Sequence, residues 1–552
     1  MSGGSKQVGD KLKRKVRGGT ALVKALEAHG VRTIFGIPGV HTLDAYDALY
    51  DSDAITTILP RHEQGAGYMA DGWYRATGRP GVALIVTGPG VTNVVTAAGE
   101  AFADSSRVLF VATNLERKYL DTLEGNLHEI TDQMGVMRPV TKWARRVMSA
   151  AEIPGAVAEA FAQLHTGRPR PVYLEIPIDV MAEEVEIGDL PVGEAAPAAP
   201  DPAQIAEAAD LIAAANRVFI LAGGGCVSEE VGPLLRELAH ELGAPVCTSL
   251  MGKGSIPEDD DYAVGAFGYR WSPDSPIAPL MTGSDLTIAI GTGLGVRTTA
   301  EGTMPLPTPL IHIDIDAHEI GRRYPTAVGI VADAALTLRA LLDTVRAGKR
   351  PKSRWSPEEV RQVREANFRP ADARAEAYAA YLHALRQAAP RNAIVTCDMT
   401  MMCYEAVRYF PVYEPRTFTF PRGFGTLGSS LPTALGAKLA RPDRPVVSLN
   451  GDGGFQFTMQ ELGAAAHHRI PVAIVIFNDS THTAVKVAQR RAYPGRYIDV
   501  DLINPDYVKL AGAYGIEAVR AESPAALGEA VAAALRRDHP VLIDVPITLE
   551  RY

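Results

Sequence analysis

The chain has 552 residues, of which 47% are hydrophobic and 22% are charged, and its formal net charge at pH 7 is −9. This length predicts about three domains of ordinary size, and the composition is that of a globular protein. The negative net charge speaks against nucleic acid or an anionic membrane surface as the main partner. No apolar run in the sequence approaches the roughly 20 residues of a membrane span, so we expect no membrane partner.

The beginning of the chain and the cysteines indicate a cytoplasmic protein. Residues 1–17 are polar and locally basic, and they lack the apolar core of a signal peptide. We therefore expect a flexible tail there. The four cysteines do not form CxxC pairs, so buried free thiols in a reducing compartment are expected. They are Cys226, Cys247, Cys397 and Cys403.

Three segments follow in which predicted helices alternate with short apolar strands, such as GVALIVT, LTIAIGTG and PVAIVIFND. A helix of ten or more residues between short apolar strands is typical of a parallel sheet flanked by helices. Linkers rich in Pro and Ala, or in charge, separate the segments. We predict an α/β fold with three doubly wound parallel-sheet domains. The domains are 18–185, 203–348 and 372–552, and the linkers are 186–202 and 349–371.

In the third segment, the strand PVVSL runs into NGDGGF, so Asp452 lies among glycines at the carboxyl end of a strand. Open parallel sheets bind ligands at this end, and glycines let backbone N–H groups approach a diphosphate. Another strand, PVAIVIF, ends in Asn478 and Asp479. Because the carboxyl ends of parallel strands meet at one edge, Asp452 and Asp479 can share one Mg²⁺ with a diphosphate. Taken alone, the GDG turn can equally be a strand that simply ends in Gly and Asp.

The combination GDG followed by ND resembles the thiamine diphosphate motif. The resemblance implies thiamine diphosphate and Mg²⁺ as cofactors. It implies that Asp452 and Asp479 bind the metal through their side chains and Thr481 through its backbone carbonyl. The second residue of the pair is usually Asn, so Asp479 departs from the pattern and adds a negative charge. The glycines at the diphosphate would be Gly451, Gly453 and Gly454.

The first segment adds an independent resemblance. IPGVHTLDAYDAL and RHEQGAGYMADGWYRATGRPGVALIVTGPGVTN look like the pyrimidine-binding domain of the acetolactate synthase-like branch. With it, the resemblance covers nearly the whole chain, in the order pyrimidine, middle and diphosphate domain. Glu63 matches the glutamate that contacts N1′ of the aminopyrimidine, which favours the imino form that removes the C2 proton of the thiazolium. As an isolated residue, Glu63 would be a helix cap or a solvated charge.

Two further segments match cofactor contacts of this family. In GFGTLGSSLPTALGAK, Leu427 stands where Met commonly separates the two cofactor rings, and the carbonyl of Gly425 would accept a hydrogen bond from the 4′-amino group. In CDMTMMCYEA, Thr400 would donate to a phosphate oxygen. Met401 and Met402 replace a Gln-His pair of acetolactate synthases, and they face either the substrate or the core.

Three histidines are candidates for contacts with the substrate. His41 lies beside the expected thiazolium site, where its neighbour Val40 offers no proton. His128 falls in the region where synthases carry Phe-Gln. His482, with Ala484, lies where the family places substrate and cofactor contacts. A neutral histidine near pH 7 suits proton transfer, while a helix cap or a surface histidine is the alternative reading.

We therefore predict decarboxylation of a 2-oxo acid that depends on thiamine diphosphate and Mg²⁺, with release or carboligation of the aldehyde-level intermediate, as in acetolactate synthases. One alternative is a 5-guanidino-2-oxopentanoate-type decarboxylase without ligation, and another is a 2-hydroxyacyl-CoA lyase. A catalytically silent binding or regulatory homologue is the alternative of a different class. The presence of Glu63, Asp452 and Asp479 argues against that last reading.

The resemblance also bears on other ligands and on assembly. The synthase segment RFDDRVTG, part of the FAD site, is replaced by GTGLGVRTTAEG, so we expect no FAD and a vestigial nucleotide-binding-like middle domain. In this family the cofactor lies between the pyrimidine domain of one subunit and the diphosphate domain of another. We therefore expect a homodimer or homotetramer with active sites at the subunit interface.

Overall fold

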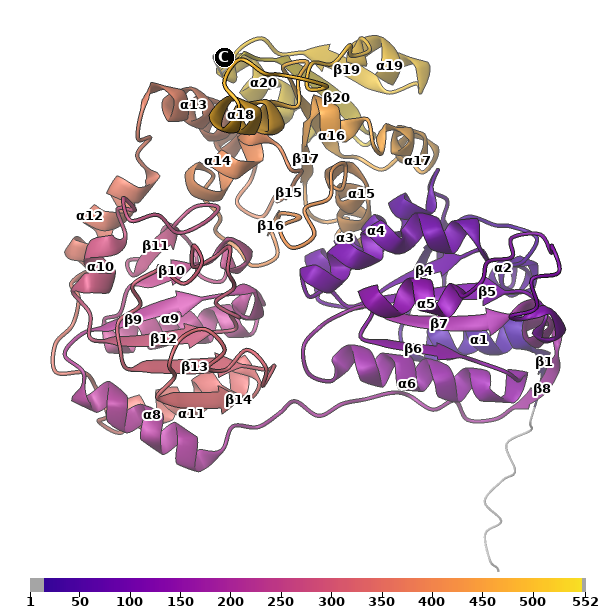
Figure 1. Ribbon diagram of the computed structural model, residues 1–552, viewed down its shortest axis with the longest axis horizontal. Coiled ribbons are helices and arrows are strands. Elements are labelled where there is room, and N and C mark those ends of the chain that lie inside the picture. The colour runs from indigo at the N-terminus through magenta and orange to yellow at the C-terminus, as the bar shows by residue number, and fades with distance from the viewer. Residues whose placement is uncertain (1–13, 549–552) are drawn as a thin grey trace, which may run out of the picture. The chain divides into compact units, whose positions relative to one another are not determined.

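The computed structural model describes residues 14–548, and these contain three six-stranded parallel sheets, each flanked by helices (Figure 1). The predicted α/β fold with three doubly wound domains is thereby confirmed. The chain forms two compact units. The first contains the N-terminal domain, residues up to 70 and 80–195, and the second contains residues 71–79 and the middle and C-terminal domains from 196 onward.

The N-terminal sheet is almost wholly buried in its central strands. In order across the sheet, its strands are β3 (Thr56–Ile58), β2 (Thr33–Gly36), β4 (Gly81–Ile85), β5 (Val108–Asn114), β7 (Val172–Pro177) and β6 (Trp143–Arg146). Every residue of β4, β5 and β7 is buried, as expected of parallel strands covered on both faces. The helices are α1 (Gly18–Ala28), α2 (Leu43–Tyr50), α3 (Glu63–Thr77), α4 (Pro89–Ala103), α5 (Gln133–Met137), α6 (Ile153–His165) and α7 (Ile178–Ala182), with 3₁₀ turns η1 (Arg117–Tyr119), η2 (Arg138–Val140) and η3 (Ala150–Glu152).

A two-stranded antiparallel sheet corrects the predicted bounds of the tail and the first linker. Strand β1 (Arg14–Arg17) pairs with β8 (Glu184–Ile187), while residues 1–13 of the expected tail lie outside the described residues. The valines of the two strands face each other and pack against the core, whereas the charged residues flank them. Strand β8 also takes up the first residues of the linker predicted at 186–202. The alternation of charged and apolar residues in EVEI is the signal for β8.

The middle domain extends further along the chain than predicted. Its strands, in order across the sheet, are β11 (Ala263–Ala266), β10 (Val246–Thr248), β9 (Val218–Ala222), β12 (Leu286–Ile290), β13 (Leu310–Asp314) and β14 (Val328–Val331). Its helices are α8 (Pro202–Ala214), α9 (Val231–Leu242), α10 (Ala278–Thr282) and α11 (Ala334–Arg346), with η4 (Gly224–Cys226) and η5 (Leu250–Gly252). Helix α12 (Pro357–Phe368) falls in the predicted linker 349–371, yet Val360 is buried in the middle-domain core and Asn367 donates to two carbonyls of the β11 region. A capping box at Ser356 explains where α12 begins.

The C-terminal sheet positions the candidate site. Its strands, in order, are β16 (Phe418–Thr419), β15 (Ile394–Cys397), β17 (Val446–Gly451), β18 (Ala473–Asn478), β20 (Val541–Pro546) and β19 (Glu517–Arg520). Its helices are α13 (Ala373–Ala388), α14 (Met401–Tyr409), α15 (Ser430–Ala440), α16 (Asp452–Phe455), α17 (Leu462–His467), α18 (Thr483–Ala492), α19 (Tyr507–Ala513) and α20 (Pro524–Ala534), with η6 (Met459–Glu461). Helices α13, α14 and α20 share one hydrophobic core with the sheet. Helix α15 packs on the opposite face, where Ser430 exchanges hydrogen bonds with Thr396 and Ser448.

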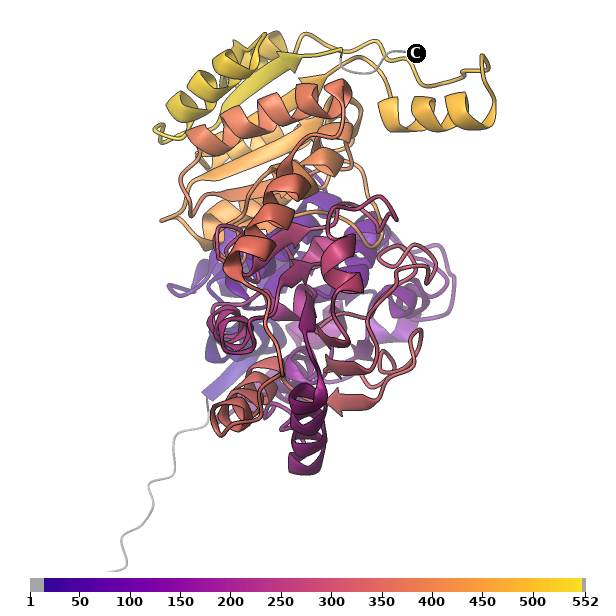
Figure 2. The ribbon, with the colours of Figure 1, turned by 90° about the vertical axis from the view of Figure 1, so that its left-hand side faces the viewer.

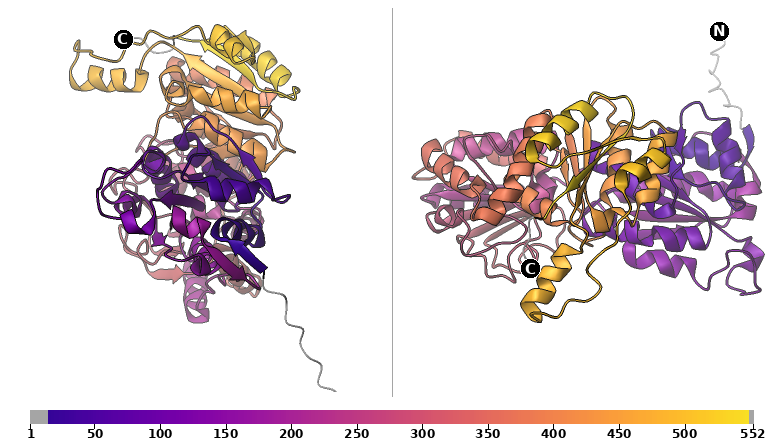
Figure 3. Two further views of the ribbon diagram at one scale, coloured as in Figure 1. Left: turned by 90° about the vertical axis from the view of Figure 1, so that its right-hand side faces the viewer. Right: turned by 90° about the horizontal axis from the view of Figure 1, so that it is seen from above.

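Helix α18 extends away from the body of the C-terminal domain, as Figures 2 and 3 show from several sides. Among residues 14–548, no helix is long and apolar enough to cross a bilayer. The four cysteines are buried and unpaired, as their spacing predicted.

Candidate active site

Strands β17 and β18 bring the two predicted metal ligands to one edge of the C-terminal sheet. The strands pair in parallel, with Gly451 opposite Phe477. Asp452 begins α16 directly after β17, and Asp479 follows directly after β18. The two carboxylates are close enough for the charge of Asp452 to raise the pKa of Asp479. The predicted convergence of these residues is therefore present in the fold.

Among the described residues, neither carboxylate has a cationic partner. Asp452 is 3% exposed, and burial raises its pKa. Burial, together with the charge of Asp452, raises the pKa of Asp479 to about 6. Within residues 14–548, no lysine, arginine or histidine forms a salt bridge with either group. A buried carboxylate next to a half-buried one is costly without a cation, and a divalent cation would neutralise both.

Hydrogen bonds fix the orientation of Asp452. Its Oδ2 accepts the backbone N–H of Ser480 at 2.8 Å and the Nδ2 of Asn504 at 2.6 Å. Ser480 adopts φ 56°, which turns the chain sharply after β18. Asn504 also donates to Oδ1 of Asn478, so it ties the ends of both strands together. Sequence reasoning missed Asn504 because it lies in a loop far along the chain from both motifs.

Asp479 is held by the residues that follow it. Its Oδ1 accepts the N–H of Thr481 at 3.2 Å, and its Oδ2 accepts the hydroxyl of Thr483. The hydroxyl of Thr481 donates to the carbonyl of Val500 at 2.7 Å, so this side chain has a structural partner. No group of three or more His, Cys, Asp or Glu side chains gathers as a metal site in the described part of the chain. A cation at this edge would thus need carbonyl, water or phosphate oxygens as well.

The buried carboxylate of Asp398 contacts all three segments that are expected to bind the cofactor, which contain Met399, Gly428 and Gly454. Asp398, directly after β15, accepts the N–H of Gly428 at 2.9 and 3.1 Å and the N–H of Met399 at 2.8 Å. A Cβ on Gly454 would lie 2.3 Å from its Oδ2. Burial raises the pKa of Asp398 to about 7, despite these backbone donors. Sequence reasoning gave Asp398 no role, although it follows a buried strand just as Asp452 does.

The remaining predicted cofactor contacts lie on the same segments. Thr400 precedes α14 without a capping hydrogen bond to that helix. It lies against Gly451, where an added Cβ would be 3.0 Å from the threonine hydroxyl. Gly425 has φ 74°, and Leu427 is half-buried. Close backbone approach of this kind fits a diphosphate-binding edge.

His482 is packed against the glycine turn. A Cβ on Gly453 would lie 2.7 Å from its ring, and its backbone N–H donates to Val500 at 2.7 Å. Ala484 follows in the first turn of α18 and is half-buried. The fold thus gathers all predicted residues from Thr400 to Ala484 at one edge of the second unit. The predicted residues Glu63, His41 and His128 belong to the first unit.

Glu63 is the first residue of α3, and its carboxylate has a defined partner. Its Oε2 accepts a hydrogen bond from Nδ2 of Asn93 at 2.9 Å. Asn93 lies on α4, one turn after the TGPG sequence. A Cβ on Gly90 would lie 3.4 Å from Oε1 of Glu63, so the carboxylate rests against the first turn of α4. The sequence contains Asn93 in the matching segment TGPGVTN, but its spacing alone does not indicate this contact.

The imidazoles of His41 and His128 lie beside each other. Their ring centroids are 4.9 Å apart at an interplanar angle of 33°. The Nδ1 atoms of both rings are buried without a hydrogen-bond partner. Burial, together with the charge of His128, lowers the pKa of His41. The neighbouring Val40 is 64% exposed, and Glu129 accepts backbone N–H groups of its own loop.

Comparison with known proteins identifies the class. Three family models match: the N-terminal TPP-binding domain of thiamine pyrophosphate enzymes at residues 16–136, their central domain at 205–341, and their C-terminal TPP-binding domain at 398–545. The chain therefore belongs to the thiamine pyrophosphate (thiamine diphosphate) enzyme family.

Relatives similar over nearly the full length narrow this class. The chain is 36% identical over 550 residues to a "Probable acetolactate synthase large subunit" of Methanocaldococcus jannaschii, covering 96% of this chain and 92% of the relative. It is 35% identical over 549 residues to the acetolactate synthase large subunit of Corynebacterium glutamicum, covering 96% and 86%. It is 38% identical over 518 residues to a "Probable 2-ketoarginine decarboxylase AruI" of Pseudomonas aeruginosa, covering 90% and 88%. The chain is thus an acetolactate synthase-like, thiamine diphosphate-dependent enzyme that catalyses carboligation or decarboxylation, and the reading as a silent homologue is set aside.

Proposed function

We propose that this enzyme decarboxylates a 2-oxo acid with thiamine diphosphate and Mg²⁺, and then releases the aldehyde-level product or joins it to a second carbonyl compound. The observation that carries the proposal is the pair of buried Asp452 and half-buried Asp479 at one sheet edge, with no cationic partner among residues 14–548. When bound, thiamine diphosphate supplies the nucleophilic carbon and the electron sink that loss of CO₂ requires.

Residues of the C-terminal domain would hold the metal and the diphosphate. Asp452, Asp479 and the carbonyl of Thr481 are the proposed protein ligands of Mg²⁺, which commonly combines one or two carboxylates with phosphate and water. Asn504 orients Asp452 by its hydrogen bond at 2.6 Å. Asp398 keeps the glycine segments together, so that their backbone N–H groups are arranged before the anion arrives.

Proton transfer falls to residues of the N-terminal domain. The carboxyl of Glu63 is proposed to hold the proton at N1′ of the aminopyrimidine, with Asn93 fixing its orientation. Because burial lowers the pKa of His41, its imidazole is neutral at pH 7 and can donate or accept a proton at the substrate. His128, whose ring lies beside it, and His482, which lies on the glycine turn, are the other proposed proton carriers.

A second candidate is decarboxylation of 5-guanidino-2-oxopentanoate without ligation. The likeness to the relative named 2-ketoarginine decarboxylase favours it, at 38% identity over 90% of this chain. The departures from the synthase pattern at Met401 and Met402 support the same candidate. Both candidates use the same metal, diphosphate and pyrimidine contacts, and they differ only in the acceptor of the intermediate.

We also propose that the middle domain binds no flavin at the edge where its glycine turns lie. The N–H of Gly225 donates to the carbonyl of Gly291 at 3.0 Å, so these turns bond to each other. The carboxylate of Glu319, which pairs with Arg322 at 2.9 Å, lies 2.6 Å from where a Cβ on Gly293 would be, so it occupies the space beside this turn. Absorbance of the purified enzyme near the flavin bands, before and after addition of FAD, tests this.

The active site is proposed to require at least two copies of the chain. In this arrangement Glu63 of one copy serves a diphosphate site built around Asp452 of another. Mixing the inactive variants Glu63→Gln and Asp452→Asn should then restore part of the activity, because some mixed sites contain both native residues. Sedimentation of the holoenzyme distinguishes a dimer from a tetramer. Full activity as a monomer would contradict the arrangement.

Product analysis tests the proposed reaction. The enzyme is incubated with pyruvate, 2-oxobutyrate or 5-guanidino-2-oxopentanoate, in each case with thiamine diphosphate and Mg²⁺. Formation of a 2-hydroxy-2-alkyl-3-oxo acid identifies a carboligase. Release of the aldehyde alone identifies a decarboxylase. Absence of CO₂ release from all of these and from other 2-oxo acids, with cofactor bound, would refute the proposal.

A further inference from the structure

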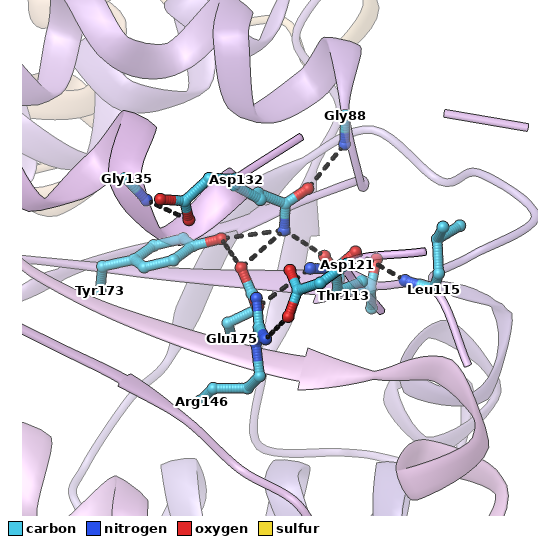
Figure 4. A network of polar contacts seen from close by, with 11 residues as sticks. Gly88, Thr113, Leu115, Asp121, Asp132, Gly135, Arg146, Tyr173 and Glu175 are labelled. Carbon is cyan, nitrogen blue, oxygen red and sulfur yellow. Dashed lines mark hydrogen bonds and ion pairs between the residues drawn. The ribbon is translucent and has the colours of Figure 1, made fainter. Parts of the chain in front are cut away.

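The loop that carries His128 is anchored at both ends to one buried carboxylate, as the close view in Figure 4 shows for Glu175 and its surroundings. Asn114, just before the loop, donates through Nδ2 to Oε1 of Glu175 at 2.9 Å. Gln133, just after the His128 loop, donates through Nε2 to Oε2 of Glu175 at 3.0 Å. Glu175 is fully buried on β7. Both ends of the segment 115–132 are thus held to the same side chain of the sheet.

Each carboxylate oxygen of Glu175 accepts a further hydrogen bond. Oε1 also accepts Nε of Arg146 at 2.5 Å, and Oε2 also accepts the hydroxyl of Tyr173 at 3.0 Å. Arg146 reaches Asp121 in the middle of the His128 loop at 3.5 Å. Burial, followed by the charge of Glu175, raises the pKa of Tyr173 well above its usual value, so its hydroxyl remains a donor. A buried network with its hydrogen bonds satisfied is rigid, and it can therefore serve as a fixed support for the His128 loop.

Gln133 connects the Glu175 network to the turn before α4. Its Oε1 accepts the N–H of Gly88 at 2.8 Å, while its Nε2 also donates to the carbonyl of Thr113 at 2.8 Å. Gly88 has φ 65°, and a Cβ there would lie 2.2 Å from the carbonyl oxygen of His128. The backbone of His128 therefore rests directly on the glycine that Gln133 holds.

His128 itself is in a strained conformation. Its φ of 68° is a left-handed value that non-glycine residues seldom adopt, and such a conformation persists where the surroundings impose it. In this conformation the imidazole lies beside that of His41. Two contacts of Gln133 maintain the conformation of His128. One fixes the end of the loop to Glu175, and the other fixes the Gly88 turn on which His128 rests.

We propose that Gln133 is a positioning residue, whose amide clamps the Gly88 turn and the His128 loop onto Glu175 and thereby holds His128 beside His41. Gln133 touches no reacting atom, and it acts through His128. The inference rests on the proposed function only for the chemical role of His128, because the clamp itself is made of contacts within the protein.

The test uses the full-length holoenzyme and the variant Gln133→Leu, which keeps similar bulk and removes every hydrogen bond of the amide. Amide exchange of residues 115–131 should become at least about tenfold faster than in the wild type, because even one lost hydrogen bond is worth up to about a factor of ten. The imidazole signals of His128, followed by ¹⁵N-histidine NMR and assigned with His128→Gln, should shift.

The matched control is Asp132→Ala. Asp132 precedes Gln133 and caps the same helix by accepting the N–H of Gly135 at 2.8 Å, whereas the hydrogen bond to Gly88 comes from Gln133. It should leave the exchange of residues 115–128 within about twofold of the wild type. Equal exchange rates and equal His128 signals in Gln133→Leu and Asp132→Ala would overturn the inference.

A second variant, Gln133→Glu, adds a signature that loss of packing cannot produce. A protonated carboxyl at this position can still donate to Glu175 and accept from Gly88, whereas an ionised one repels Glu175, and Arg146 and Asp121 are the other charges nearby. Exchange of residues 115–131, taken relative to the wild type at each pH, should be slower at pH 6 than at pH 8, because the ionised form is the one that repels Glu175. The same ratio at both values would overturn the inference, even if Gln133→Leu fails to fold.

Turnover separates this inference from the proposed function. If the wild type turns over a 2-oxo acid, Gln133→Leu should lower kcat more than Asp132→Ala does, with little change in KM. If the wild type turns over none, the proposed function fails, while the exchange and NMR comparison still decides the role of Gln133. If exchange and signals change but kcat does not, the clamp is supported and the catalytic role of His128 is refuted.

Discussion

Replacing Asp479 by Asn is expected to stabilise the protein when it is free of cofactor and metal. The carboxylate of Asp479 is half-buried next to that of Asp452, with no cationic partner in the described part of the chain, so ionising it costs free energy in the folded state. The amide is neutral and nearly the same size. Its oxygen can still accept the N–H of Thr481, which now bonds to Oδ1 at 3.2 Å. The hydroxyl of Thr483 can turn to accept from the new NH₂ group.

The magnitude follows from the pKa. A folded-state pKa of about 6, raised from 3.8, means that the cost is absent below pH 4 and grows as the pH rises through 6. At pH 8 the shift of about 2 units corresponds to about 3 kcal/mol, and at pH 5 to about half of that. Asp479→Asn should therefore raise the free energy of unfolding by up to about 3 kcal/mol at pH 8 and by clearly less at pH 5.

Thermal and denaturant unfolding of the metal-free protein at pH 5 and pH 8 measure this difference. Asp538→Asn is the control, since the Asp538 side chain is 83% exposed and its pKa is lowered by a hydrogen bond from His539. Saturating Mg²⁺ and thiamine diphosphate should remove or reverse this gain in stability, because the cation then binds the charged carboxylate of Asp479. A gain in Asp479→Asn that is equal at both pH values, or a loss of stability at pH 8, would refute the reasoning.

Three further changes test other parts of the site. Glu63→Gln should strongly slow exchange of the C2 proton of bound thiamine diphosphate, and an unchanged rate measured by NMR would refute its role. Gly454→Ala should abolish cofactor binding measured by calorimetry, because its Cβ would lie 2.3 Å from Asp398, whereas Gly512→Ala meets nothing within 4 Å and should bind normally. Asp398→Asn replaces an acceptor of the Gly428 N–H and should weaken cofactor binding about tenfold; unchanged affinity would show that this carboxylate does not order the segments.

Much of the fold could be predicted because parallel sheets leave a plain signal in sequence. The apolar runs of β5, β17 and β18 are continuous since both faces are covered, and all three domains were recognised from such runs. Strands β1 and β8 were overlooked because each has only four residues and lies at the surface, where charge dominates the composition. Helix α12 was taken as a linker because five of its twelve residues are charged.

For the candidate site, too, some residues could be predicted from the sequence and others could not. Asp452 and Asp479 could be placed together, since neighbouring parallel strands end at one edge. Asn504, Asp398 and Gln133 could not be given roles, because their contacts depend on how a loop returns to that edge or on a buried side chain from another strand. Such contacts join residues far apart in sequence, and no periodic pattern in the sequence predicts them.

The most direct test of the account is CO₂ release from 2-oxo acids by the purified enzyme, measured with thiamine diphosphate and Mg²⁺ together, with each alone, and with neither. The account predicts release from at least one 2-oxo acid only when both are present, and its loss in Asp452→Asn and Glu63→Gln. Release without Mg²⁺ after complete chelation of metal, or undiminished release by Asp452→Asn, would contradict the proposed site.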